Sequence, residues 1–285
     1  MRLIGDDNSI GPLVTLQTSG TVTGAIGVAH ANGNVLAAWP TSGPSDTRYG
    51  SFRLDGTALA DASLGMPAIS DVQSGANELI VETLTSGTVQ VSTIDAAGAQ
   101  STPLTATANA SIPGHAVRNS LGYGVLWTSS GSMLHLTGLF SMGAIYLPDR
   151  ALGSAAGTLF VWTGTRHVLV WGSASGAPQL EFLDENLQVT SGPFEVLGPS
   201  TYSANQSFAW NGTELGVFRT QSSPYDLAFT PTDETGTALT AEMQLGPGTP
   251  MQLNGPYEAG GPNRFAVVWS VGSNPAEVRF AVVCR

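Results

Sequence analysis

The chain has 285 residues, which is long enough to bury a large hydrophobic core without disulfides, and its one cysteine, Cys284, has no partner within the chain. Only 11% of the residues are Asp, Glu, Lys or Arg, yet the formal net charge is −11, and all ten basic residues are arginine. A chain of this charge repels phosphate backbones and carries no basic stripe, which argues against nucleic acid as a partner. No apolar run reaches the length of a membrane span, so none is predicted.

The polar part of the composition is dominated by Ser, Thr, Gly and Asn rather than by charged residues. Such a surface is suited to hydrogen bonding with neutral polar ligands such as glycans or peptides, although a generic export-type surface has the same composition. Because Lys and Cys are so scarce, we expect an extracellular or cell-envelope protein and a monomer, with the cytoplasm as the open alternative. The start, MRLIGDDNSIGP, lacks the apolar region of a signal peptide, which fits either a cytoplasmic chain or a mature one.

Strand-like cores recur along the chain. They are VLAAWPTSG from Val35, LIVETLTSG from Leu79, YGVLWTSSG from Tyr123, VLVWGSASG from Val168, LGVFRTQSS from Leu215 and FAVVWSVGS from Phe265. The cores align on Trp39, Glu82, Trp127, Trp171, Phe218 and Trp269, at steps of 43 to 51 residues. A period in this range, with strands throughout, is typical of propeller blades.

Each core has extended neighbours on both sides. An extended piece precedes it, and a second alternating strand follows a short Ser/Gly/Pro turn, which is the signal of a hairpin. A weaker strand comes next, so each unit is predicted to be a four-stranded antiparallel sheet. No window shows a sustained helical period, and helices should be nearly absent.

The two ends of the sequence predict how the repeat closes. The sixth unit stops at Cys284 and Arg285 after its third strand, while RLIGDDNSIGPLVTL from Arg2 matches EFLDENLQVTSGPFEVL from Glu181. Pairing of the first segment with the last blade would close the ring and remove a raw sheet edge. We therefore expect an all-β, six-bladed β-propeller that forms a single domain over residues 1–285, with about 47 residues in each blade.

On these repeats the chain resembles bacterial six-bladed β-propellers with degenerate repeats, over essentially its full length. It lacks the sialidase Asp-box, the WD40 Gly-His and Trp-Asp pairs, the kelch double glycine, the Trp motif of quinone-binding propellers and the calcium loops of FG-GAP repeats. The resemblance therefore implies a fold, and it implies no activity and no cofactor.

Candidate site residues follow from the fold, because the first strand of each propeller blade lines the central channel. Three of them are weak catalytic candidates: His115, Asp71 and Glu258. His115 follows Pro113-Gly114 at the mouth of such a strand, so a general-base role with Asp71, Glu258 or Tyr257 across the channel is one interpretation. A histidine that is simply hydrogen-bonded in a loop is the other. The candidates for ligand binding are Tyr202, Tyr257, Arg118, Asn205, Tyr225 and Arg48. Strand alternation separates Arg118 from His115 unless a bulge intervenes.

The remaining chemistry-bearing residues favour structural roles. Repeated tryptophans indicate packing between blades, and the aspartates that recur after the third strand are predicted to satisfy backbone N–H groups in turns, at Asp6, Asp7, Asp55, Asp95, Asp184 and Asp233. His30 is expected to pack at a strand end, His135 to lie on the solvent side of a strand or to be satisfied there, and His167 to lie in a tight turn. No two histidines have the spacing of a metal motif, so no metal is predicted.

These patterns favour a binding or scaffold propeller, without enzymatic activity, that engages a glycan, peptide or protein partner on its loop or channel face. The alternative is a hydrolase or lyase whose active site lies in the channel, and a third interpretation is a spacer within a longer surface protein. The sequence leaves open whether the protein is an enzyme, because no nucleophile elbow or catalytic triad order is present.

Overall fold

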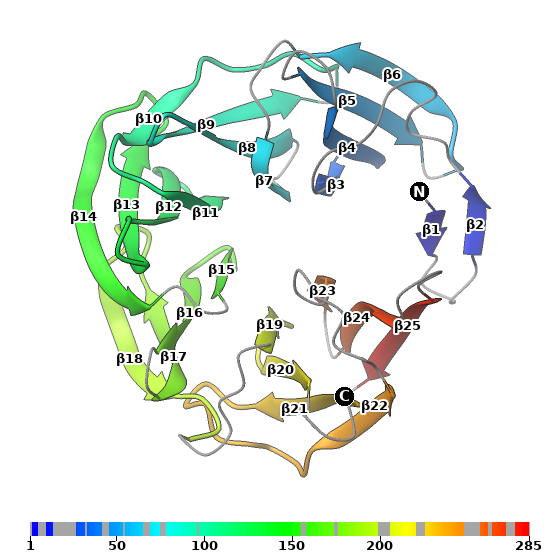
Figure 1. The fold of residues 1–285 in the computed structure, drawn as a ribbon, viewed down its shortest axis with the longest axis vertical. Helices are drawn as coiled ribbons and strands as arrows, with labels where there is room; N and C mark the ends of the chain where they lie inside the picture. The colour runs from blue at the N-terminus through cyan, green and yellow to red at the C-terminus, as the bar shows by residue number, and fades with distance from the viewer. Residues whose placement is uncertain are drawn as a thin grey trace. The chain divides into compact units, whose positions relative to one another are not determined.

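The computed structural model describes residues 2–4, 10–13, 27–31, 33–41, 46–53, 55–64, 69–74, 78–95, 97–154, 158–173, 176–198, 206–220, 226–247, 257–261, 264–271 and 277–284. The chain divides into two compact units, residues 1–131 with 135–151 (unit 1) and residues 132–134 with 152–285 (unit 2). All regular elements in the described ranges are β-strands (Figure 1). The described residues form no helix that is long and apolar enough to cross a membrane.

Unit 1 is built from four-stranded sheets in which each strand pairs with the next one along the chain. The first is β3 (Gly27–Ala31), β4 (Asn34–Thr41), β5 (Asp46–Arg53) and β6 (Ala58–Ser63). The second is β7 (Ile69–Ser74), β8 (Glu78–Thr85), β9 (Thr88–Asp95) and β10 (Leu104–Thr107). The third, most of which belongs to unit 1, is β11 (Ile112–Arg118), β12 (Gly122–Thr128), β13 (Met133–Phe140) and β14 (Ile145–Ser154).

Unit 2 continues the same pattern. One sheet is β15 (Thr158–Trp162), β16 (His167–Ser173), β17 (Gly176–Leu183) and β18 (Val189–Glu195). The next is β19 (Gln206–Trp210), β20 (Leu215–Thr220), β21 (Asp226–Thr232) and β22 (Met243–Pro247). The last is three-stranded, with β23 (Tyr257–Gly261), β24 (Arg264–Val271) and β25 (Glu277–Cys284). Each predicted core thus coincides with the second strand of its sheet.

The predicted number of blades is wrong. The described residues form five four-stranded sheets, and the strands of the expected sixth blade form a sheet of three. Repeated up-and-down sheets of four antiparallel strands are the organisation of a β-propeller, so the class of fold was correctly predicted.

The predicted pairing of the first segment with the last blade is not found among the described residues. Instead β1 (Arg2–Ile4) and β2 (Ile10–Leu13) pair with each other, Arg2 opposite Leu13 and Ile4 opposite Ile10. The reason lies in the segment that the first residues resemble, because β17 and β18 are themselves an antiparallel pair with Leu183 opposite Val189. The sequence match identified a hairpin of two strands rather than one closing strand.

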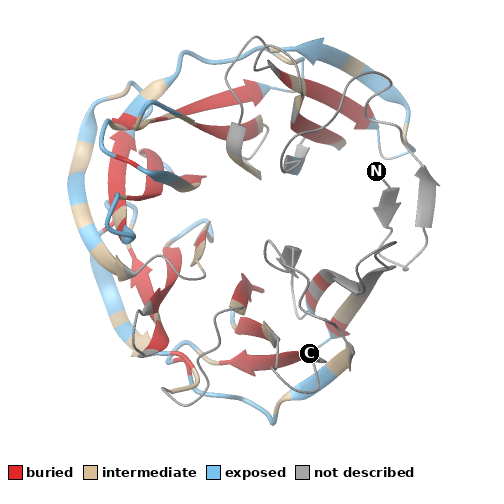
Figure 2. Cartoon of the chain, in the orientation of Figure 1, coloured by how far each residue is buried: buried red, intermediate tan, exposed pale blue. Residues whose placement is uncertain are grey.

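In the four-stranded sheets, burial falls from the middle strands to the outermost strand over the residues whose burial is described. All seven residues of β12 are buried, whereas β6 and β18 are mostly exposed (Figure 2). A strand covered on both faces needs apolar residues at every position, which explains why cores such as VLVW in β16 do not alternate. The outer strands, covered on one face at most, retain the weaker pattern seen in the sequence.

Within each unit, successive sheets pack face to face. In unit 1, Ile80 and Val91 of the β7–β10 sheet share a cluster with Val125 and Trp127 of the next sheet. In unit 2, Phe182 of the β15–β18 sheet packs with Phe208 and Trp210 of the following one. Trp39, Trp127 and Trp171 are buried, as predicted for packing residues, and each contributes about 2–3 kcal/mol by leaving water.

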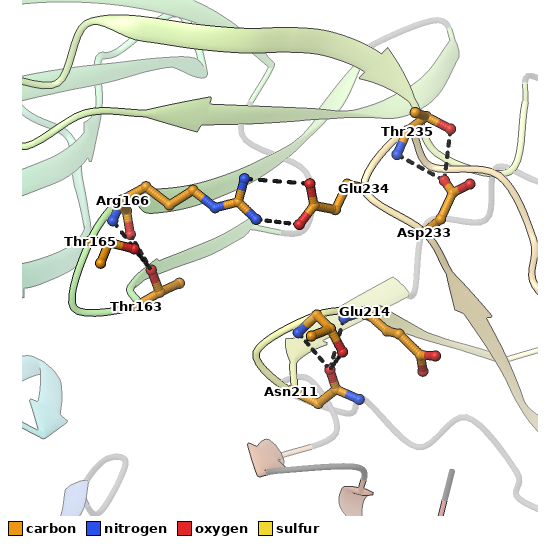
Figure 3. A network of polar contacts seen from close by, with 9 residues as sticks. Thr163, Thr165, Arg166, Asn211, Glu214, Asp233, Glu234 and Thr235 are labelled. Atoms are coloured by element: carbon orange, nitrogen blue, oxygen red, sulfur yellow. Dashed lines mark hydrogen bonds and ion pairs between the residues drawn. The ribbon is translucent and has the colours of Figure 1, made fainter.

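An ion pair between Arg166 and Glu234 joins two of these sheets in unit 2 (Figure 3). The two terminal guanidinium nitrogens of Arg166, Nη1 and Nη2, donate to the Glu234 carboxylate. Arg166 lies in the turn before β16, and Glu234 lies in the turn after β21. The same guanidinium lies 4.2 Å from the centre of the Phe182 ring and 5.9 Å from that of Trp210. Arg166 therefore covers the edge of the apolar cluster while it pairs with the neighbouring sheet.

The recurring aspartates act in turns, as predicted for those in the described residues. The Asp95 carboxylate accepts the backbone N–H groups of Ala97 and Ala99, and that of Asp233 accepts those of Thr235 and Thr237. Gly98 and Gly236 take positive φ angles of 85° and 76° in these turns, which glycine adopts without strain. Asp6 and Asp7 lie outside the described residues.

Candidate functional site

Two neighbouring first strands depart from regular pairing. The ladder between β7 and β8 shifts register between Ile69 and Asp71, and the ladder between β11 and β12 shifts between Pro113 and Ala116. The first-strand ladders of the other four sheets, β3–β4, β15–β16, β19–β20 and β23–β24, are regular over their described residues. Bulges change the direction of side chains and are common beside binding and active sites, so these two bulges indicate a candidate site.

The two bulged strands bring three polar side chains together. His115 Nδ1 lies 3.1 Å from Asp71 Oδ2, and Gln73 Nε2 donates to the same Asp71 oxygen at 3.0 Å. Gln73 Nε2 also lies 3.2 Å from His115 Nδ1. The side chains of His115 and Asp71 are 31% and 19% exposed, so the cluster is held by protein on one side and reaches solvent on the other. The sequence interpretation named Asp71, Glu258 or Tyr257 across the channel as partners of His115; in the structure Asp71 lies beside it on the first strand of the adjacent sheet, and a catalytic role stays a prediction.

A fourth polar group, Glu82, lies beneath this cluster. It stands directly opposite Asp71 across β7 and β8, and only 1% of its surface is exposed. Its Oε1 accepts the backbone N–H of Gly114 at 3.3 Å, while its buried Oε2 has no hydrogen-bond partner among the described residues. Burial raises the pKa of Glu82 well above the usual 4.5, and the charge of Asp71 raises it further, against the opposing effect of the Gly114 N–H. Burial therefore favours the protonated, neutral form of Glu82.

Sequence reasoning used Glu82 only to align the repeats and missed it as a site residue. The signal was present, because Glu82 occupies the position filled by aromatic residues in the other five cores. A carboxyl group at this position places a polar group against the bulge of β11, where it accepts the Gly114 N–H.

Gly114 fixes the position of His115. A Cβ atom at Gly114 would lie 2.8 Å from the carbonyl oxygen of Leu126 on β12, so the bulge can approach this strand only with glycine at that point. The same backbone carries the N–H that Glu82 accepts. The bulge, the buried acid and the histidine are therefore one structural unit.

The cluster can do two kinds of chemistry. Asp71, Gln73 and His115 present carboxylate, amide and imidazole groups, which together donate and accept hydrogen bonds to a polar ligand. If His115 carries its proton on Nδ1 and donates it to Asp71, Nε2 is the basic atom of the ring, the tautomer used by general bases. Among the described residues, no three His, Cys, Asp or Glu side chains are arranged to hold a metal ion.

Other predicted site residues do not join the cluster. Arg118 pairs with Glu78, and its guanidinium lies 6.0 Å from the centre of the Tyr123 ring. Arg48 pairs with Asp61 at 2.6 Å on the first sheet. Each arginine therefore forms an ion pair with a nearby carboxylate rather than with the cluster around His115.

The remaining candidates fall where the structure gives no side-chain description. Tyr202, Asn205 and Tyr225 lie outside the described residues. Tyr257 and Glu258 belong to β23, opposite Val268 and Val267, and their side chains also lie outside the described part of the chain. Their roles stay predictions.

Two of the other histidines, His135 and His167, are structural, and the side chain of His30 lies outside the described residues. His135 stacks on Trp127 with ring centres 4.1 Å apart and lies 2.6 Å from Asp149. His167 was expected in a tight turn, but it is the first residue of β16 and is fully buried between the rings of Phe160 and Trp162. Its pKa is lowered to about 4, chiefly by burial, and its Nδ1 lies 3.0 Å from the carbonyl oxygen of Asp184. His30 pairs opposite Val35 in β3 and β4.

Comparison with known proteins establishes the fold. No family model matches the chain, and no curated protein does. The BP39L lectin from Burkholderia pseudomallei has a TM-score of 0.60 at 15% identity, over 90% of this chain and 81% of the lectin chain. The subtype N11 neuraminidase-like protein of A/flat-faced bat/Peru/033/2010 has a TM-score of 0.59 at 11% identity, over 95% of this chain and 88% of the other.

A third similar structure is the β-propeller domain of the Trilobed protease from Pyrococcus furiosus, which has an open velcro topology. Its TM-score is 0.54 at 6% identity, over 94% of this chain and 84% of that domain. Identities this low demonstrate a shared fold and nothing about activity. The chain is a β-propeller with four-stranded antiparallel blades.

Proposed function

We propose that this protein is a binding propeller that recognises a polar ligand, foremost a glycan, through Asp71, Gln73 and His115. The observation that carries the proposal is the pair of bulges that directs these side chains from two adjacent sheets to one partly exposed point. A carboxylate, an amide and an imidazole within hydrogen-bond reach of one another are the groups that bind sugar hydroxyls. Peptide and protein partners offer similar groups and remain the competing ligands.

Two further facts support a neutral ligand. The chain carries a net charge of −11, which repels anionic partners. One of the similar structures is a lectin by name, so the fold accommodates glycan binding in at least one other protein. We also propose that the protein is exported and monomeric, in agreement with its composition.

The test is a glycan array probed with the wild-type protein and with His115→Ala. His115 is partly exposed, so its truncation should leave the fold intact while it removes one side of the site. We expect binding to a restricted set of neutral glycans by the wild type and loss of those signals in the variant. Binding that survives in His115→Ala would place the ligand elsewhere.

A second candidate function is a hydrolase or lyase that uses the same residues. It is favoured by the position of Glu82 opposite Asp71. Burial raises the pKa of Glu82 and so favours its protonated form, and a protonated carboxyl beside a carboxylate–imidazole pair is a combination used for acid–base catalysis. In this scheme His115, oriented by Asp71, accepts the proton of the attacking water and then returns it to the oxygen of the leaving group. Glu82 holds the bulge that carries His115 through its hydrogen bond with the Gly114 N–H.

Chromogenic 4-nitrophenyl glycosides test the catalytic scheme. Turnover that depends on pH and is lost in Glu82→Gln would favour the enzyme. Binding of a glycan without turnover of any glycoside would favour the binding protein.

A further inference from the structure

Unit 2 contains a cavity that is separate from the cluster around His115. Its volume is 450 Å³, and it opens where the segment after β18 meets β20, β21 and the segment that leads to β22. Its walls include Glu195, Leu197, Arg219, Thr230, Thr240 and Glu242. All of these residues belong to unit 2, whereas Asp71, Gln73 and His115 belong to unit 1.

The two sides of the cavity are fastened together by backbone contacts. Leu197 donates its backbone N–H to the carbonyl oxygen of Gly236 at 2.9 Å. A Cβ atom at Gly236 would lie 2.6 Å from the carbonyl oxygen of Glu195, so the two segments approach as closely as glycine permits. These contacts fix the segment after β18 against the turn after β21 along one side of the cavity.

The polar groups of the cavity are arranged around an ion pair. Arg219 on β20 donates through Nε and Nη2 to Glu242, and the two side chains are only 22% and 20% exposed. Gln244 donates to the other Glu242 oxygen at 3.3 Å. A guanidinium and a carboxylate held side by side offer donors and acceptors at a fixed spacing, which matches a pair of neighbouring hydroxyl groups.

The remaining lining narrows the class of ligand. Thr230, which is 5% exposed, Thr237 and Thr240 supply hydroxyl groups to the lining. Leu197 and two alanines supply a small apolar surface. Two glutamates against one arginine give the lining a net negative charge, which disfavours phosphate and carboxylate ligands. The volume suits a molecule of one or two sugar rings, since small-molecule sites measure about 300–1,000 Å³.

We propose that this cavity is a second binding site, for a neutral polyhydroxylated small molecule of mono- or disaccharide size, held by the Arg219–Glu242 pair. The site stands independently of the cluster in unit 1, and each can be correct without the other.

The test is saturation-transfer NMR on the full chain with D-glucose, D-galactose, D-mannose, cellobiose and lactose as probes, in the Asp71→Asn, His115→Ala background. Ala241 lines the cavity and is exposed, so Ala241→Trp should fill it without removing a buried contact. Leu239 is 42% exposed and does not line the cavity, which makes Leu239→Trp the matched control. We expect binding of at least one probe in the background and in the control, and its loss in Ala241→Trp.

Two further measurements make the result decisive. Glu242→Gln keeps the size of the side chain but removes its charge, so the affinity for the bound probe should fall about tenfold or more. Glucose 6-phosphate should bind more weakly than glucose because the lining is negative. The proposal is overturned if no sugar probe binds at a concentration of about 10 mM. It is also overturned if Ala241→Trp binds the probe as well as Leu239→Trp does, or if glucose 6-phosphate binds more tightly than glucose.

Discussion

Asp71 and Glu82 face each other across β7 and β8, a carboxyl group at the surface opposite a carboxyl group in the core. Two like charges at directly opposed positions of a sheet destabilise it, and the buried one has lost its hydration as well. Both effects raise the pKa of Glu82, so the protonated form of Glu82 is the one that this pairing favours.

Glu82 should make the protein less stable as the pH rises. Its folded pKa is raised above the usual 4.5, so between that value and the folded pKa the native state holds a proton that the unfolded state has lost. The free energy of unfolding then falls by up to about 1.4 kcal/mol per pH unit across that window. Glu82→Gln removes this loss. In urea unfolding, the free energy of unfolding should therefore fall less between pH 5 and pH 8 in the variant than in the wild type. A pH dependence identical to that of the wild type would contradict the burial of a protonated acid.

Gly114→Ala should disrupt the site through the backbone. The added Cβ meets the backbone of Leu126 at 2.8 Å, so β11 must move away from β12, at a cost of about 1–3 kcal/mol. Gly131→Ala is the matched control, because nothing lies within 4 Å of a Cβ there and its φ is not positive. We expect a lower unfolding midpoint in urea for Gly114→Ala alone; equal midpoints for the two variants would show that the bulge tolerates a side chain.

Arg166→Met should destabilise unit 2 by about 1–2 kcal/mol, the sum of an exposed ion pair and a cation–π contact. Glu234→Gln separates the two parts, since it removes the ion pair and leaves Arg166 over Phe182. Because the Arg166 and Glu234 side chains are 33% and 50% exposed, this second variant should lose less than about 1 kcal/mol, and the loss should shrink in high salt. Larger damage from Glu234→Gln than from Arg166→Met would mean that the ring contacts contribute little.

His167 should contribute to acid unfolding. Its pKa falls from 6.5 to about 4 in the folded chain, so between these values the unfolded state binds a proton that the native state does not. Stability is therefore complete above pH 6.5 and is lost as the pH falls, at up to about 1.4 kcal/mol per pH unit. His167→Phe keeps an aromatic ring and should flatten this slope, whatever its effect at neutral pH. Histidine NMR should give a midpoint near 4 for His167, and a midpoint near 6.5 would refute its burial as a neutral ring.

The strands were predictable because their signals are local. Trp171 and the apolar run before it mark β16, and the Ser/Gly/Pro turn after it marks the hairpin to β17, independently of the rest of the chain. The aspartate turns are local for the same reason, since the carboxylate of Asp95 bonds to residues two and four positions later.

The site was only partly predictable because it depends on contacts between sheets. His115 and Asp71 were both predicted to line the channel, because each was assigned to the first strand of a propeller blade. The sequence did not reveal the bulges, since first strands of six or seven residues are too short for a reversal of the alternation by one extra residue to be recognised in the sequence. Nor did it reveal the acid at Glu82, whose environment exists only once β11 packs beside β8.

The most direct test of the proposed site is a calorimetric titration of the glycan selected on the array into three proteins, the wild type, Asp71→Asn and Asp149→Asn. The two variants make the same change in two histidine-paired carboxylates of unit 1, and only Asp71 belongs to the site. Loss of a hydrogen bond to a charged group predicts an affinity about tenfold or more lower for Asp71→Asn, and an unchanged affinity for Asp149→Asn. Equal affinities in all three proteins would contradict the assignment of ligand binding to Asp71, Gln73 and His115.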